Sequence, residues 1–142
     1  MTTRQDYIDQ ARLWLGTPFR WQADYRGLGC DCKGLITGVA RELGLPEADH
    51  PHFKKADYSS KVDPDFLKRA LSETLASVDN PVPGDVLLLI LGGKPQHMGI
   101  IGGSTLIHCY VGKTVSEHRL DSAIRLWPIH SAWRFRSLTN GD

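Results

Sequence analysis

The sequence predicts an α+β domain in which helices from the first half of the chain pack on an antiparallel sheet from the second half. Apolar residues recur with a period near 3.6 in three segments of residues 1–75. From residue 86 onward the pattern changes to short apolar or β-branched runs separated by turns that contain glycine. Helices first and strands after favour an α+β fold over a parallel α/β sheet.

The first predicted helix lies near the N-terminus. Charged residues separate its apolar positions, which are Tyr7, Ile8, Ala11, Trp14 and Leu15. Gly16 and Pro18 end this helix. Residues 17–29 then form an expected irregular loop, which we predict to pack through the aromatic side chains of Phe19, Trp21 and Tyr25.

The second predicted helix begins at Asp31 or Cys32, and Gly44 with Pro46 supplies its stop signal. Its apolar positions follow helical spacing and are Leu35, Ile36, Val39, Ala40 and Leu43. This assignment places Cys32 in the N-terminal turn of a helix.

The third predicted helix follows a polar connection, residues 47–62, to which we assign no element. Asp63 is typical of an N-cap, and Pro64 would then occupy the first helical position. The apolar stripe of this helix comprises Phe66, Leu67, Ala70, Leu71 and Leu75.

Five strands are expected after the turn at residues 80–85, where Asp85 is read as a turn residue. They cover residues 86–91, 98–101, 105–110, 111–117 and 132–138. The segment Gly102-Gly103-Ser104 predicts a hairpin between the second and third strands. We find no repeat, low-complexity tract or linker, so residues 1–142 are expected to form one domain.

Composition excludes several classes of protein. Seventeen Lys and Arg against sixteen Asp and Glu leave a net charge of +1, which gives no field to attract nucleic acid. The longest apolar run, residues 86–91, is far shorter than the roughly 20 residues of a membrane-spanning helix. The N-terminus has no signal-peptide pattern, so we expect synthesis in the cytoplasm without general export. Three cysteines are too few, and odd in number, for a disulfide framework.

Cys32 is the strongest candidate for chemistry. Unpaired backbone N–H groups at a helix N-terminus stabilise a thiolate, and they can also receive the oxyanion of a tetrahedral intermediate. A base is supplied if the predicted hairpin forms, because it would place His97 and His108 as neighbours on one face of the sheet. One imidazole would then act as base and the other would orient it.

Several short motifs, in this order, resemble the NlpC/P60 family of papain-like cell-wall cysteine peptidases. They are Gly16-Thr17-Pro18-Phe19-Arg20-Trp21, Cys30-Asp31-Cys32-Lys33-Gly34-Leu35, Pro83-Gly84-Asp85-Val86, His97-Met98-Gly99-Ile100-Ile101 and Ile107-His108. The resemblance covers residues 5 to about 110. The compact form with Cys-Asp-Cys looks most like the bacteriophage branch, which includes tail-associated and gene-transfer-particle peptidases.

This resemblance implies Cys32 as nucleophile, His97 as general base and acid, and His108 as the residue that holds the His97 ring. It implies a peptidoglycan stem peptide as substrate, cut next to γ-D-glutamate and commonly before diaminopimelate, with no cofactor and no metal. Asp31 matches the acidic residue before the family nucleophile, where it receives the substrate amine or simply caps the helix. Phage or gene-transfer-particle tail proteins are the implied partners, and the cell wall is the implied place of action.

The chain departs from the family pattern at three places that bear on the cleft. Phe19, a predicted substrate contact together with Trp21, stands where many members have tyrosine. Gln22-Ala23 replaces the usual Gly-Gly, and Lys33 replaces a small or apolar residue. We expect the Lys33 side chain to point outward.

Two alternatives remain open from sequence. Zinc chemistry would use the Cys₂His₂ set Cys30, Cys32, His97 and His108, although one residue between the cysteines departs from the usual two to four. A non-catalytic tail-tip or wall-binding module would keep the fold without cutting. We assign structural roles to Cys30 and Cys109, and local or solvent hydrogen bonds to His50, His52, His118 and His130.

Overall fold

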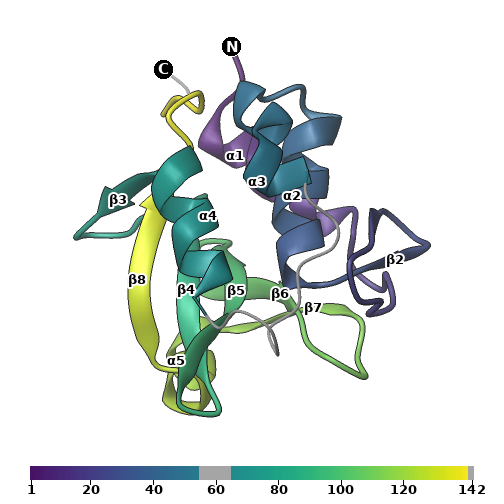
Figure 1. The fold of residues 1–142 in the computed structure, drawn as a ribbon, viewed down its shortest axis with the longest axis vertical. Coiled ribbons are helices and arrows are strands. Elements are labelled where there is room, and N and C mark those ends of the chain that lie inside the picture. Colours follow the sequence, from purple (N-terminus) through teal and green to yellow (C-terminus); the bar gives the residue numbers. More distant parts are fainter. Residues whose placement is uncertain (55–64, 141–142) are drawn as a thin grey trace.

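The computed structural model describes residues 1–54 and 65–140, and its main sheet has six antiparallel strands. The sheet order is β3-β8-β4-β5-β6-β7 (Figure 1). The strands are β3 (Ala76–Val78), β4 (Val86–Leu91), β5 (Lys94–Ile101), β6 (Thr105–Cys109), β7 (Val115–Arg119) and β8 (Ile129–Arg134). With the helices around it, this sheet confirms the predicted α+β class.

Most of the helices come from the first half of the chain, as predicted. They are α1 (Arg4–Arg12), α2 (Cys32–Glu42), the 3₁₀ turn η1 (Pro46–Asp49), α3 (Pro51–Lys54), α4 (Phe66–Thr74) and α5 (Leu120–Leu126). A separate two-stranded hairpin pairs β1 (Asp24–Tyr25) with β2 (Gly29–Cys30). None of the helices in the described part of the chain is long and apolar enough to cross a bilayer.

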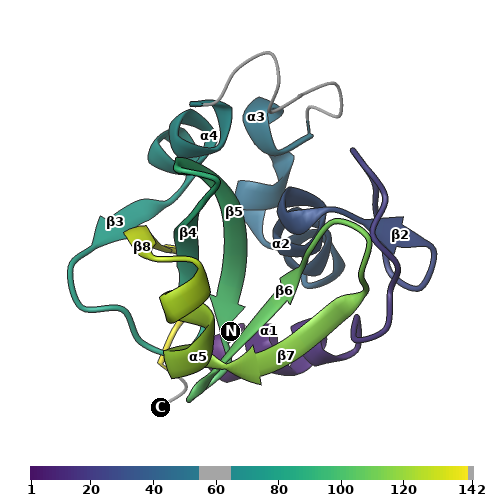
Figure 2. The same ribbon diagram turned by 90° about the horizontal axis from the view of Figure 1, so that it is seen from below.

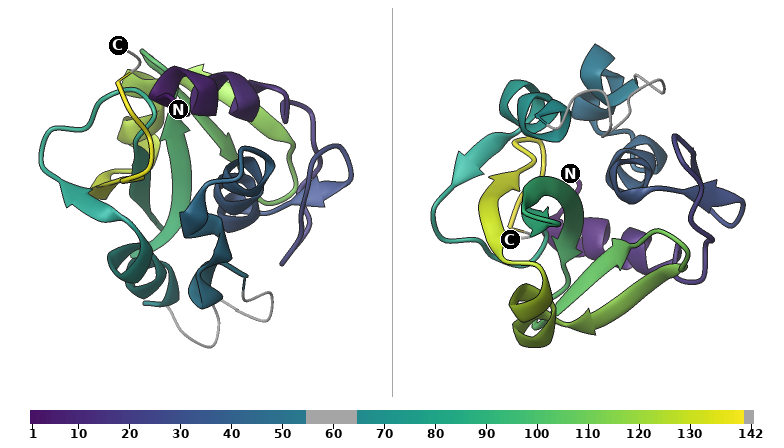
Figure 3. Two further views of the ribbon diagram at one scale, coloured as in Figure 1. Left: turned by 90° about the horizontal axis from the view of Figure 1, so that it is seen from above. Right: turned by 60° about the horizontal axis from the view of Figure 1, so that its bottom comes forward.

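Helix α1 begins at a reciprocal cap. The Thr3 hydroxyl accepts the N–H of Asp6, and the Asp6 carboxylate accepts the N–H of Thr3, each at 2.9 Å. The Arg4 N–H donates to the Thr139 carbonyl at 2.9 Å, so the segments around these two residues lie side by side (Figure 1). At its other end α1 reaches the turn between β5 and β6, as seen from above in Figure 3.

The sheet has a separate apolar cluster on each face because strand side chains alternate. Helices α1 to α4 pack with Met98 and Ile100 of β5, whereas α5 packs on the opposite face with Ile101 of the same strand. In Figure 2 the sheet curves around α2, and α5 lies on its outer side. This curvature brings the N-terminus of α2 to the end of β6.

The first helix and the loop after it differ from prediction. Helix α1 ends at Arg12, and residues 13–16 form turns, so Trp14 is buried beyond the helix while Leu15 is exposed. Of the three aromatic side chains through which this loop was expected to pack, Trp21 and Tyr25 remain 60% and 61% exposed. The β1–β2 hairpin gives this loop more order than predicted, and its short strands carry no alternating pattern that could be recognised.

Several strand boundaries also differ from the predicted ones. Strand β4 matches its prediction, but β5 begins four residues earlier than residue 98, and β8 covers residues 129–134 rather than 132–138. Strand β7 begins only at Val115, after a turn. Neither β3 nor α5 was predicted. The polar connection at residues 47–62, where the sequence predicts no element, contains α3 and most of η1. The predicted cap Asp63-Pro64 lies outside the described residues.

Candidate active site

Cys32 is the first residue of α2, as the sequence predicts. Asp31 is the N-cap, and its Oδ1 accepts the N–H of Gly34 at 2.7 Å. The Asp31 Oδ2 accepts the N–H of Gln22 at 2.8 Å, which ties the preceding loop to the helix start. Asp31 is only 1% exposed, so its carboxylate organises the backbone around Cys32.

The backbone at this helix start leaves no room for a side chain at Gly34. A Cβ atom on Gly34 would lie 1.9 Å from the carbonyl oxygen of Ala23. Gln22 has φ of 63°, the left-handed conformation that favours glycine. The chain therefore keeps a glycine-type loop here even though Gln22-Ala23 replaces Gly-Gly.

The sulfur of Cys32 meets strand β5. Pairing between β5 and β6 ends at Gly99 and His108. The next N–H of β5 that faces the β6 side belongs to Met98, and it lies beyond the last hydrogen-bonded pair of the two strands. The Met98 N–H hydrogen bonds to the Cys32 sulfur and favours its ionised form. Because Met98 directly follows His97, helix α2 places the thiol at the strand segment that carries the predicted base.

His97 and His108 are in direct contact, as the predicted hairpin required. The distance from Nε2 of His97 to Nδ1 of His108 is 3.0 Å, and both residues are 2% exposed. The indole of Trp127, which follows α5, packs on both imidazoles with ring centroids 5.2 and 5.1 Å away. Because Nε2 of His97 is the nitrogen in contact with His108, Nδ1 is the other ring nitrogen of His97 and does not contact His108.

Burial sets the charge state of these groups. It raises the pKa of Cys32 to about 12, with a further contribution from Asp31, although the N–H groups of Met98 and Lys33 act in the opposite direction. Burial also lowers the pKa of His97 to about 3 and that of His108 to about 4. These shifts favour a neutral thiol and neutral imidazoles in the site without substrate, whereas the position of Cys32 at a helix N-terminus predicts a thiolate.

A third histidine extends the pair toward solvent. Nε2 of His108 lies 2.9 Å from Nδ1 of His118, an exposed residue of β7. The sequence predicts only local or solvent contacts for His118. Its placement depends on the pairing of β6 with β7, where His118 lies opposite Leu106 on the face that carries His108.

A groove of about 930 Å³ is lined by His108 and His118, and His97 is not among its lining residues. Phe19, one of the predicted substrate contacts, lines it together with Tyr110, Lys113, Trp127, His108 and His118. Trp21, the other predicted contact, does not line the groove but packs edge-to-face on Phe19 with centroids 4.9 Å apart. Asp31 lies beneath the surface.

Lys33 corrects another expectation. Its side chain is 5% exposed rather than pointing outward, and its Nζ donates to the carbonyl of Phe53 at 2.8 Å. Burial lowers the pKa of Lys33, and the nearby Asp31, Asp24 and Cys32 act in the opposite direction. Lys33 thus joins the start of α2 to the end of α3.

The other two cysteines are fully buried. The Cys109 thiol donates to the Cys30 carbonyl at 3.4 Å, and the contact between the two sulfurs raises the pKa of Cys30. Among the described residues, the ligand atoms of Cys30, Cys32, His97 and His108 do not gather into a metal-binding group. The zinc alternative therefore lacks its ligand geometry.

One cluster with ligand chemistry does occur within residues 1–54 and 65–140, formed by His50, His52 and Glu73. It lies at α3 and α4, away from the histidine pair. Nδ1 of His50 already accepts the N–H of His52 at 3.1 Å, and His52 pairs with Glu73. These are the local contacts that the sequence analysis assigned to His50 and His52.

A cysteine at the start of a core helix, set against an antiparallel strand that carries a histidine, defines the papain-like class of folds. Within that class the chain belongs to the NlpC/P60 family, whose family model matches residues 16–134. Two solved structures agree in fold. NlpC2 from Trichomonas vaginalis has a TM-score of 0.68 at 18% identity, covering 93% of this chain and 46% of that one. The NlpC/p60 domain of peptidoglycan hydrolase SagA has a TM-score of 0.62 at 20% identity, covering 94% and 100%.

The curated relatives that this chain matches are longer proteins. Two proteins of Corynebacterium glutamicum, each described as "Probable endopeptidase", are 29% identical over 136 residues. The match covers 94% of this chain and 54% of each relative. The chain therefore spans about half the length of the curated relatives it matches.

Proposed function

We propose that this chain is a thiol-dependent peptidoglycan hydrolase that cleaves stem-peptide bonds. One observation carries the proposal: the Cys32 sulfur accepts the N–H of Met98, directly after His97, at the first turn of α2. In this proposal Cys32 is the nucleophile and His97 is the base. Family membership, and relatives described as an endopeptidase or a peptidoglycan hydrolase, support this class of substrate.

In the proposed reaction, Nδ1 of His97 takes the thiol proton while the Cys32 sulfur attacks the peptide carbonyl carbon. Backbone N–H groups in the first turn of α2 stabilise the resulting oxyanion. His97 then gives the proton to the leaving amine, which leaves a thioester on Cys32. Water, deprotonated by His97, hydrolyses this thioester and restores the thiol.

The neutral resting state is compatible with this sequence of steps. Each pKa shift reflects the cost of one buried charge beside a neutral partner. Transfer of the proton from Cys32 to His97 creates both charges together, and their attraction in a poorly solvated site offsets part of that cost. Proton transfer therefore accompanies attack on bound substrate rather than preceding it.

We propose that the scissile bond lies next to γ-D-glutamate, as in γ-D-glutamyl-diaminopimelate, because the motifs resemble peptidases of that specificity. The groove offers the ammonium of Lys113 for a substrate carboxylate, and apolar walls at Phe19 and Trp127. The Asp31 carboxylate already accepts the N–H groups of Gly34 and Gln22 below the surface. If Asp31 also attracts the substrate amine, it does so through its buried negative charge.

We further propose that the protein works in a phage or gene-transfer particle that meets the cell wall from outside. The Cys-Asp-Cys form of the nucleophile motif supports this context. Mass spectrometry of purified particles from a producing strain is the test. The protein should copurify with tail components, and its absence from intact particles would contradict the proposal.

Hydrolysis is tested by incubating the protein with defined muropeptides and weighing the fragments. A mass gain of one water divided between two products identifies the bond that is cut. Cys32→Ala should bind without producing fragments. Binding of muropeptides by the unaltered protein with no fragment would favour the non-catalytic wall-binding module.

A further inference from the structure

We propose that His118 is a positioning residue for this thiol site, holding His108 in the tautomer that leaves His97 free to act as base. The inference rests on the proposed hydrolase function. It is drawn from two consecutive contacts: His97 Nε2 to His108 Nδ1 at 3.0 Å, and His108 Nε2 to His118 Nδ1 at 2.9 Å.

The three rings form a chain in which each contact needs one donor and one acceptor. A neutral imidazole has one of each, so the direction of one hydrogen bond fixes the direction of the next. If His118 accepts from His108, then His108 accepts from His97, and Nδ1 of His97 keeps its lone pair. In the reverse direction Nδ1 of His97 carries the proton and cannot take another from Cys32.

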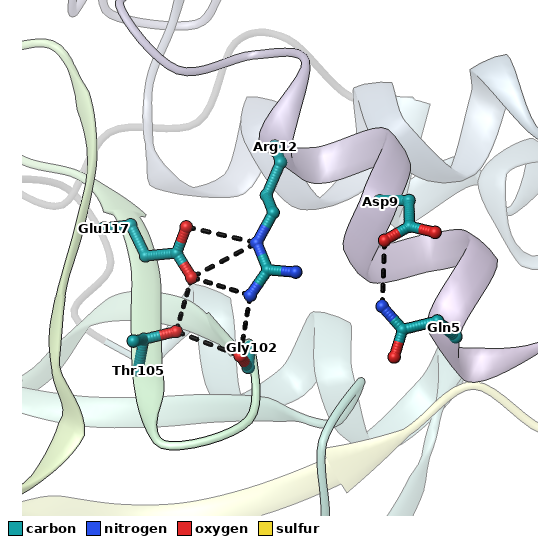
Figure 4. A network of polar contacts seen from close by, with 6 residues as sticks. All are labelled: Gln5, Asp9, Arg12, Gly102, Thr105 and Glu117. Atoms are coloured by element: carbon teal, nitrogen blue, oxygen red, sulfur yellow. Dashed lines mark hydrogen bonds and ion pairs between the residues drawn. The ribbon is translucent and has the colours of Figure 1, made fainter.

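The strand that carries His118 is anchored from its other face. Glu117, the preceding residue, pairs with Arg12 of α1 at 2.9 Å, and Arg12 also donates to the carbonyl of Gly102 at 2.9 Å. Thr105 donates to the same carboxylate (Figure 4). Neighbouring strand residues point to opposite faces, so this network fixes β7 while His118 faces His108.

Several titratable and charged groups neighbour His118 on β7 and on the adjacent elements. In the groove it shares walls with His108 of β6 and with Tyr110 and Lys113 of the following turn. On the side of α5, Asp121 is paired with Arg119, and the Glu117 carboxylate is paired with Arg12 on the opposite face. His118 is exposed, so its outer nitrogen can bond to water while its inner nitrogen meets His108.

The direct test is the imidazole nitrogen NMR spectrum of the unaltered protein at neutral pH. His108 should carry its proton on Nε2, and His97 should carry its proton on Nε2 as well. A proton on Nδ1 of His108 would overturn the proposal, whatever any variant does.

Variants provide the functional test, with the rate of iodoacetamide reaction at Cys32 and the rate of muropeptide cleavage as readouts. His118→Ala should lower both at pH 7 by about tenfold, the equivalent of one pKa unit. His118→Asp supplies an oxygen that can only accept, so it should restore both rates to within about threefold. It should also move the acidic limb of the cleavage profile to higher pH, because a carboxylate favours the protonated imidazole.

His130→Ala and His130→Asp are matched controls, because His130 is an exposed residue of β8. Within the described residues, its side chain hydrogen bonds only to the hydroxyl of Ser131. Both should behave like the unaltered protein. Equal rates for His118→Ala and His130→Ala would refute the role of His118 alone. Absence of muropeptide cleavage in the unaltered protein, with the alkylation differences intact, would refute the hydrolase function and leave the positioning role standing.

Discussion

The backbone N–H of Met98 donates to the sulfur of Cys32, which joins the start of α2 to strand β5 at the residue after His97. Cys30 and Cys109 have no exposed surface, whereas Cys32 is 8% exposed. Iodoacetamide should therefore modify Cys32 first at neutral pH, because the reagent can reach it and because His97 accepts its proton in the proposed mechanism. Mass mapping of the labelled peptides after short exposure measures this order.

Cys109→Ala is the matched control for that experiment. It removes a buried thiol that lies outside the proposed mechanism, so the labelling rate of Cys32 should change by less than about twofold. Labelling of Cys30, Cys32 and Cys109 at one common rate would contradict a reactive site at α2. It would indicate instead that the reagent enters only when the domain unfolds.

The helix start and the hairpin of the site could be predicted because both are local features of the sequence. Asp31 and Gly34 are three residues apart, the spacing at which an N-cap side chain reaches a backbone N–H. His97 and His108 flank a glycine turn that sets the register of two neighbouring strands. In both cases a short stretch of sequence determines which groups meet.

The parts that could not be predicted depend on elements packed from elsewhere in the chain. Trp127 reaches the histidines only because α5 packs on the outer face of the sheet. Lys33 is buried because α3 covers the start of α2, and no pattern near Lys33 indicates that cover. His118 lacks a distinctive motif, so only the register between β6 and β7 reveals its contact with His108.

Acid should destabilise the protein through its buried histidines. The folded-state pKa values of His97 and His108 lie below the ordinary value near 6.5, so the unfolded chain binds more protons as the pH falls through 6.5. Stability present above that pH is lost below it. We expect the free energy of unfolding to fall by about 2 kcal/mol per buried histidine between pH 7 and pH 5. Urea denaturation at both pH values measures the loss.

The contribution of one ring can be isolated with His97→Gln. This variant should lose about 2 kcal/mol less than the unaltered protein over the same pH interval, because one titrating group is gone. His130→Gln removes an exposed ring and should leave the pH dependence as it was. If the free energy of unfolding fell equally with pH in the unaltered protein and in His97→Gln, His97 would not be held neutral by the fold.

Two substitutions one turn apart on α2 should have opposite effects on stability. Gly34→Ala drives a Cβ atom into the Ala23 carbonyl, a backbone group that cannot rotate away, and should cost about 3 kcal/mol or more. Thr37→Val should stabilise by about 1 kcal/mol, because the Thr37 hydroxyl is buried without a hydrogen-bond partner in the described part of the chain. Thermal and urea unfolding of the two variants test both directions, and a neutral Gly34→Ala would contradict the close approach.

Trp127 should control the proton affinity of the histidine pair. Burial is the largest cause of the lowered pKa values of His97 and His108, and the Trp127 indole covers both rings. Trp127→Ala admits water, which favours the protonated imidazoles and should raise both pKa values toward 6.5. The acidic limb of kcat/KM should move to higher pH as a result, because His97 must be neutral to accept the thiol proton.

NMR titration of the imidazole signals measures the same change without substrate. Trp21→Ala is the matched control, since Trp21 is an exposed tryptophan that packs on Phe19 rather than on the histidines. It should leave the titration midpoints of His97 and His108 in place. If Trp127→Ala also leaves them in place, the low proton affinity arises from the strands alone, and the indole serves only as a wall of the groove.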